Sequence, residues 1–508
     1  MMSRQLMNKV LDGFTSLKGS PNELWIAFTL KFLDSYSYFS FSVIMTLFLS
    51  EDFGYSDYQA GTIYGVWGAL VTLFGLTTGP IIDKLGVATS LRIGFLISFI
   101  AKCLIFITSS RVNLLLAIVL LSYGNCLGIP VLTVGIRRYT NSDNQGFAFG
   151  LFYVIMNLAA LLSGPTVDFC TIYFANKMKD DQQQDNGRLL EDMNNNDNLV
   201  PEWSFTGYRL VILIGIIANI AACLITLSVK EIKVSSPPTT SSSSLGRRNQ
   251  NNTTSNNDSG TETFQPVKAS TKEIFIETIH SPDFWRFLVV CMITINIRMI
   301  FRHLDATLPK YMVREFGENV AKGSIYAINP ALIMILVPII SAATTKVDPL
   351  IMIHHGCYIS ALSVFFLVMS TSITSCIFFV VVLSIGESIW SPRLYDYTMQ
   401  IAKEGREGTY MALSSAPLFL AKLPVGMMSG YLLQKYCPEE GPRNSKMMWL
   451  IIGLTTVVSP VLLTLCWGYI SRRSSSSSNR SSNDDAEATY DEISPLSEMA
   501  TIQTTKSG

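Results

Sequence analysis

Several charged residues of this chain stand inside long apolar stretches. Glu387 lies near the middle of the stretch 374–400, and Arg298, Arg302 and Asp305 follow one another at i, i+4 and i+7 in another. That spacing places the last three on one face of a helix. A buried carboxylate can hold a cationic group or exchange a proton, and an arginine can hold a carboxylate. Glu387 is therefore the first candidate for ligand binding or protonation; the alternative is a structural carboxylate paired with an arginine.

The first apolar stretch carries a second pair of charges. Lys31 and Asp34 are three residues apart and can share a helix face with Tyr38. Charges in such a position usually mark a pathway for ions or solutes, so we regard both as candidates for proton coupling. The alternative is a structural ion pair between helices. Arg298 is a candidate ligand for a carboxylate, whereas Arg302 and Asp305 fit a gate or solvent contact near a helix bend.

The composition indicates the setting of these charges. The 508 residues are 49% hydrophobic and 15% charged, which is too apolar for an ordinary soluble protein. Lys and Arg balance Asp and Glu at 38 each, and no basic block suits a nucleic acid. The cysteines and histidines are scattered, without the spacing of a metal site. No nucleophile–base pair is evident, so we expect neither an enzyme nor a cofactor.

Twelve stretches have the length and apolar content of a transmembrane helix, which needs about 20 residues. They lie near residues 23–50, 59–82, 89–108, 112–135, 147–171, 207–229, 284–312, 321–345, 349–369, 374–400, 409–434 and 447–470. We expect the longest of them to tilt or break.

These stretches predict an all-α membrane protein with two six-helix bundles. The predicted parts are an N-terminal segment 1–22, a first bundle 23–229, a disordered linker 230–283, a second bundle 284–470 and a disordered tail 471–508. Lys and Arg gather in the loops on the side of both termini, so the positive-inside rule puts the termini in the cytoplasm. We expect a multi-pass protein of the plasma membrane or of an endolysosomal or vacuolar membrane.

The loop between the second and third stretches carries a motif. It reads Gly-Pro-Ile-Ile-Asp-Lys-Leu-Gly over residues 79–86 and resembles the loop signature of the major facilitator superfamily. Its carboxylate can offset a cation at a neighbouring helix end, and its glycines permit close helix approach. The resemblance implies a role in conformational gating; an ordinary charged turn is the alternative. The residues concerned are Gly79, Asp83, Lys84, Gly86, Arg137 and Arg138.

Four further stretches narrow the resemblance. The aromatic-rich residues 37–49, the Phe-Tyr-Val-Ile-Met-Asn run 152–157, Ile-Asn-Pro at 328–330 and Gly-Glu-x-x-x-Ser-Pro at 386–392 are similar to segments of the proton-coupled oligopeptide transporter family. They occur in that family's order and on the corresponding helices. The resemblance implies a major facilitator fold with a binding site between the two bundles.

The resemblance also implies roles for individual residues. Asn157, Asn329 and Glu387 match the positions that hold a peptide's ammonium end, and Tyr38 and Tyr153 could form walls. The other half of the family's site differs. Lys31-x-x-Asp34-Ser35 stands in place of Glu-x-x-Glu-Arg on the first helix, and Ile129 stands in place of the lysine on the fourth. Specificity for peptides and coupling to protons therefore stay open.

The sequence predicts a secondary transporter that moves a small amine-bearing solute, an amino acid or short peptide, by alternating access. The expected partners are the lipid bilayer, a small-molecule substrate and protons. Two alternatives remain: a carrier of the same fold for an unrelated, anionic solute held by the arginines of stretch 284–312, and a non-transporting receptor or scaffold that acts through its linker and tail.

Overall fold

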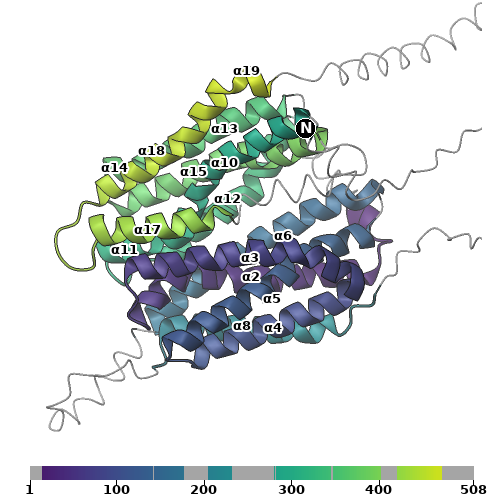
Figure 1. Cartoon of the computed structure of the whole chain (residues 1–508), viewed down its shortest axis with the longest axis horizontal. Helices are drawn as coiled ribbons and strands as arrows, with labels where there is room; N and C mark the ends of the chain where they lie inside the picture. The colour runs from purple at the N-terminus through teal and green to yellow at the C-terminus, as the bar shows by residue number, and fades with distance from the viewer. Residues whose placement is uncertain are drawn as a thin grey trace, which may run out of the picture.

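The computed structural model describes residues 14–140, 142–174, 176, 204–231, 280, 282–344, 347–401 and 420–471. For some stretches inside helices, among them 76–84 and 137–138, it describes the backbone alone. The described chain is almost entirely helical and forms two stacked halves (Figure 1).

The N-terminal half contains six long helices. They are α2 (Asn22–Glu51), α3 (Asp57–Leu85), α4 (Val87–Ile107), α5 (Arg111–Tyr139), α6 (Ser142–Asp168) and α8 (Gly207–Thr226). α6 continues into a π-helical turn, Phe169–Phe174. The C-terminal half contains α10 (Pro282–Ala306), α11 (Leu308–Phe316), α12 (Lys322–Ala343), α13 (Pro349–Ser363), α14 (Phe365–Met369), α15 (Ile373–Ile401), α17 (Lys422–Tyr436), α18 (Ser445–Leu465) and α19 (Trp467–Ile470).

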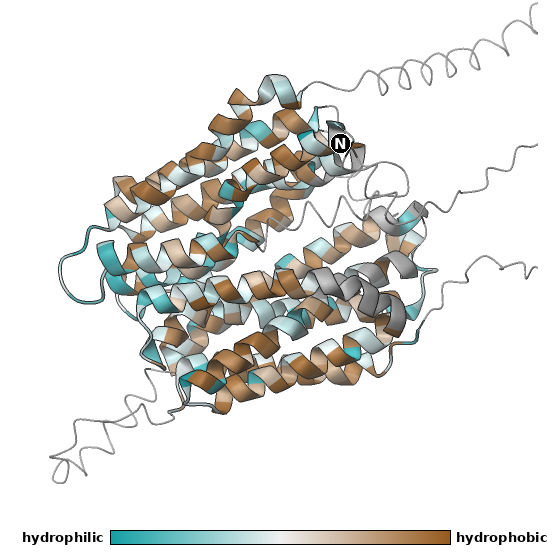
Figure 2. Ribbon diagram, viewed as in Figure 1, coloured by the Kyte–Doolittle hydropathy of each residue, from teal (hydrophilic) through white to brown (hydrophobic). Residues whose placement is uncertain are grey.

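As far as the structure describes it, each predicted stretch coincides with one helix or with consecutive helices. Ten of the helical segments are long and apolar enough to cross a membrane, and Figure 2 shows hydrophobic residues along most of their length. The longest predicted stretch, 284–312, is broken: α10 ends at Ala306 and α11 begins at Leu308. Residues 402–419, which include the start of the predicted eleventh helix, lie outside the described residues. The predicted all-α membrane fold is confirmed.

Side chains begin several of these helices. Thr206, Asp348 and Asn444 each accept a hydrogen bond from a backbone N–H in the first turn of the helix that follows. These caps satisfy donors that have no partner within the helix. They explain why α8, α13 and α18 begin within two residues of the starts of the predicted apolar stretches.

The two halves meet mainly along two pairs of helices, and α2 also contacts α10 and α11. α3 packs against α17, and α6 packs against α12. A side chain at Gly61 would overlap the backbone of Gly426, and one at Gly164 would overlap the backbone of Gly323. Glycine at these positions lets the backbones touch, as at many contacts between membrane helices.

The predicted linker 230–283 and tail 471–508 lie almost wholly outside the described residues. Their disorder, the predicted domain limits and the cytoplasmic position of the termini stay predictions.

Candidate functional site

The carboxylate of Glu387 lies on α15 and faces Asn329 on α12. Asn329 Nδ2 donates to Glu387 Oε2 at 3.0 Å and to Ser384 Oγ at 3.0 Å. Glu387 and Asn329 are both partly exposed although each lies well inside its helix. The structure thus brings together two of the three residues predicted to hold an ammonium group.

Arg298 is the cation whose charge acts most strongly on Glu387. Arg298 is 3% exposed, and its Nε and Nη2 have no hydrogen-bond partner among the residues that the structure describes. The guanidinium lies over the ring of Trp390, with Cζ 5.3 Å from the ring centroid. Buried donors without acceptors are costly, so a ligand with a carboxylate would gain by binding here.

Asn157 adopts a different arrangement. Its Nδ2 donates to the carbonyl of Tyr153, one turn earlier in α6, at 2.9 Å. In this conformation the Asn157 amide therefore bonds to the backbone of its own helix rather than to Glu387. Tyr153 is partly exposed, and its role as a wall stays a prediction.

Asp305 links the two halves near their middle. Its Oδ2 accepts from Arg302 at 3.3 Å on its own helix, and from Ser42 at 3.0 Å and Tyr64 at 3.2 Å in the N-terminal half. Arg302 is 8% exposed and Asp305 is 2% exposed, so both lie inside the molecule rather than in solvent.

Lys422 occupies a group of aromatic rings from the other half, which we call the aromatic box. Its Nζ lies 3.8 Å from the ring centroid of Trp67, 4.7 Å from that of Tyr64 and 4.8 Å from that of Tyr38. Within the described part of the chain, Nζ has no hydrogen-bond partner, and the residue is fully buried. The sequence shows a lysine inside an apolar stretch but does not show which rings surround it.

A third charged residue, Lys102, lies near the predicted pair Lys31 and Asp34. Asp34 is partly exposed, and the charges of Lys31 and of Lys102 on α4 both act on it. Lys102 Nζ donates to the carbonyl and the hydroxyl of Ser37. Lys31 Nζ lies 4.6 Å from the ring centroid of Phe152 and has no hydrogen-bond partner among the described side chains and backbone. Sequence reasoning missed Lys102, although its place in the apolar stretch 89–108 was a signal.

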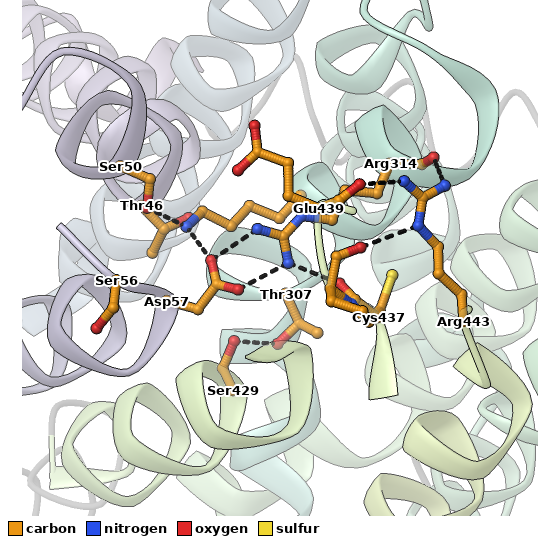
Figure 3. Close-up of polar contacts among 12 residues, drawn as sticks. Thr46, Ser50, Ser56, Asp57, Thr307, Arg314, Ser429, Cys437, Glu439 and Arg443 are labelled. Carbon is orange, nitrogen blue, oxygen red and sulfur yellow. Dashed lines mark hydrogen bonds and ion pairs between the residues drawn. The ribbon is translucent and has the colours of Figure 1, made fainter. Parts of the chain in front are cut away.

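One end of the helix bundle is held shut by a cluster of ion pairs, the closing cluster (Figure 3). Asp57 at the start of α3 accepts from Lys310 at 2.8 Å and from Arg314 at 2.7 and 2.9 Å. Lys310 also donates to Ser50, and Arg314 also donates to the carbonyl of Cys437 at 2.6 Å. Asp57 and Ser50 belong to the N-terminal half and the other three to the C-terminal half.

A second contact supports the same end. Asp168, the last residue of α6, accepts from the backbone N–H of Gly323 at 2.7 Å and of Ser324 at 2.6 Å. The carboxylate thereby caps α12, a helix of the other half. Hydrogen bonds and ion pairs between described residues of the two halves all lie between the middle of the helices and this end.

The predicted gating motif lies at the opposite end of α3. Gly86 has φ of 80°, which favours glycine, and the carboxylate of Glu231 accepts from the N–H groups of Val87 and Ala88. This contact joins the end of the first half to the start of α4. The side chains of Asp83, Lys84, Arg137 and Arg138, and the surroundings of Gly79, lie outside the described part of the structure.

The glycine contacts make a prediction. We expect Gly164→Leu to push α6 and α12 apart, because overpacking costs about 1–3 kcal/mol, equivalent to about 5- to 150-fold fewer closed molecules. Spin labels at Tyr58 and Glu440, both exposed at the end that holds the closing cluster, would report a longer distance between the two halves. The control is Gly150→Leu on the same helix, where nothing lies within 4 Å of an added Cβ. Equal distances in both variants would contradict the prediction.

Comparison with known proteins places this arrangement in a family. Residues 27–421 match the model of the Major Facilitator Superfamily. Among curated proteins, none matches the chain. The chain therefore belongs to the Major Facilitator Superfamily, a family of membrane transporters.

Solved structures of transporters share the fold. A POT family transporter in complex with 5-aminolevulinic acid superposes with a TM-score of 0.66 and 14% identity, over 90% of this chain and 98% of that one. A bacterial homologue of the human lysosomal transporter Spinster, inward-facing and unoccupied, gives 0.63 and 16%, over 88% and 95%. The nucleoside transporter NupG gives 0.63 and 10%, over 87% and 99%. At these identities the similarity concerns the fold.

Proposed function

We propose that the protein is a secondary transporter for a small solute that carries an ammonium group, such as an amino acid or a short peptide. The observation that supports this most is the Glu387 carboxylate. It is held by Asn329, is partly exposed, and has no ion pair among the described residues. A carboxylate in that state can accept an ammonium group.

Arg298 supports a solute with two charged ends. Its buried and unused donors suit a carboxylate, while Glu387 suits an amine. The POT family complex contains 5-aminolevulinic acid, which bears both groups. Protons are the proposed coupling ion, with Glu387 and Asp34 as the groups that exchange them.

Alternating access follows from the placement of contacts between the halves. The closing cluster, the Asp168 cap and the glycine contacts hold one end together. With the predicted orientation this is the outer end, so the conformation is closed to the outside. Rocking of the halves would break these contacts and open the outer end.

The test is uptake of a labelled pool of amino acids and dipeptides by vesicles containing the purified protein, with and without an inward proton gradient. We expect accumulation that depends on the gradient. If replacing both Glu387 with Gln and Asp34 with Asn left gradient-driven uptake unchanged, the proposed coupling would be wrong. If no member of the pool entered, the amine-bearing class of solute would be wrong.

A second candidate is a transporter for an anionic solute. The buried centre has an excess of two positive charges, since five cations face three carboxylates. The cations are Lys31, Lys102, Arg298, Arg302 and Lys422, and the carboxylates are Asp34, Asp305 and Glu387. Competition by anionic rather than cationic test solutes, lost in Arg298→Gln, would favour this candidate. A receptor or scaffold role would instead be favoured by two results together: no solute is transported, and removal of residues 232–279 abolishes a cellular response that depends on the protein.

A further inference from the structure

The aromatic box holds the ammonium group of Lys422. Lys422 Nζ makes no hydrogen bond to any residue that the structure describes, and the three rings of Tyr38, Tyr64 and Trp67 lie within 4.8 Å of it. A buried ammonium without acceptors is costly. The attraction between the cation and the ring faces offsets part of this cost, and so does the negative charge of Asp305, which accepts a hydrogen bond from Tyr64 of the box.

The box and its occupant belong to different halves. Tyr38 is on α2, Tyr64 and Trp67 are on α3, and Lys422 is the first residue of α17. The lysine enters because α3 and α17 touch. A Cβ at Gly65 would lie 2.9 Å from the Leu423 carbonyl, and one at Gly68 would overlap the side chain of Lys422. Parting α3 from α17 therefore withdraws the lysine and leaves the rings in the N-terminal half.

The rings of the box also pack against one another and against Phe41. The Trp67 ring packs at 5.2 Å from that of Tyr38, 5.7 Å from that of Phe41 and 6.1 Å from that of Tyr64. Trp67 is 1% exposed and Tyr64 is fully buried. Three ring faces held by their neighbours form a preorganised site, and such a site is the usual means of recognising an organic ammonium ion.

We propose that the aromatic box is a binding site for an organic ammonium group, filled by Lys422 in this conformation and by the solute when α3 and α17 part. Lys422 and the solute then compete for the same site. When α3 and α17 come together again, the lysine re-enters the box and displaces the solute's ammonium group towards the centre of the protein, where Glu387 can accept it. This inference rests on the proposed function, because it assumes an amine-bearing solute, and it adds a second place where that amine binds.

The test uses n-propylammonium, which replaces the atoms that Lys422→Ala removes. Titration calorimetry on the full-length variant should show propylammonium binding about tenfold or more tightly than the neutral 1-propanol. All proteins compared in these titrations also carry Glu387→Gln, which removes the other proposed ammonium site and leaves the box alone to be measured. The protein with Glu387→Gln only should show no such binding, because the lysine fills the box. Lys422→Met, which fills the space without a charge, should also show none.

Two variants test the role of the rings and of closure. Adding Trp67→Leu to Lys422→Ala should abolish propylammonium binding. Asp57→Asn, which weakens the closing cluster but keeps the lysine, should give binding that Trp67→Leu again removes. This second pair gives the result even if Lys422→Ala does not fold. Binding that survives Trp67→Leu, equal binding of 1-propanol, or no binding to any variant would overturn the proposal.

The outcome is separate from that of the uptake experiment. Propylammonium binding to the box without transport of any amine would retain the box and remove the proposed function. Transport of an amine that depends on Glu387, together with no binding to the box, would retain the proposed function and remove the box as a binding site.

Discussion

Replacing Glu387 with glutamine is expected to lower uptake of the amine-bearing solute about 10- to 150-fold, since a hydrogen bond to a charged group contributes about 1.5–3 kcal/mol. The substitution keeps the size of the side chain, and Asn329 can still donate to the remaining oxygen. What disappears is the negative charge that attracts the ammonium group and the site that takes up a proton. The measurement is uptake into vesicles at several solute concentrations.

Two assays separate binding from coupling in this variant. If Glu387 carries the proton, Glu387→Gln should lose accumulation against a gradient while exchange of internal for external solute persists. If Glu387 binds the ammonium group, both should fall together. The control is Glu440→Gln, an exposed position at the closed end. Wild-type uptake and exchange in Glu387→Gln would remove Glu387 from the site.

Replacing Asp57 with alanine should have the largest effect on conformation. The carboxylate neutralises both Lys310 and Arg314, whose side chains are only 3% and 10% exposed. Removing one partner of a buried pair costs about 3–5 kcal/mol, because the remaining charges stay uncompensated. That cost falls on the closed state alone, so we expect the closed end to part. Spin labels at Tyr58 and Glu440 should report a longer distance.

Asp52 provides a matched control at the same end. It pairs with Arg209 at 3.0 Å, and both residues belong to the N-terminal half. Asp52→Ala should therefore lower thermal stability without changing the distance between the labels. An unchanged distance in Asp57→Ala, or an equal change in both variants, would show that the closing cluster does not hold the halves together.

Much of the fold could be predicted because its cause is local. A stretch of about 20 apolar residues must form its backbone hydrogen bonds internally in a bilayer, and a helix does so. The break within 284–312 was expected only from the length of that stretch, and its place at Thr307 came from the structure. The closeness of Asn329 and Glu387 followed from the family resemblance rather than from spacing.

The sequence by itself determined the class of protein, the helical stretches and the charges that need an explanation inside them. The tertiary structure alone decided their partners. Asp57 pairs with Arg314, which is 257 residues away in the sequence, and Lys422 packs among aromatic rings on helices of the other half. No periodicity encodes such contacts, because they depend on how two bundles dock. Glycines at the crossings of α3 with α17 and of α6 with α12 bring the backbones close enough for that docking.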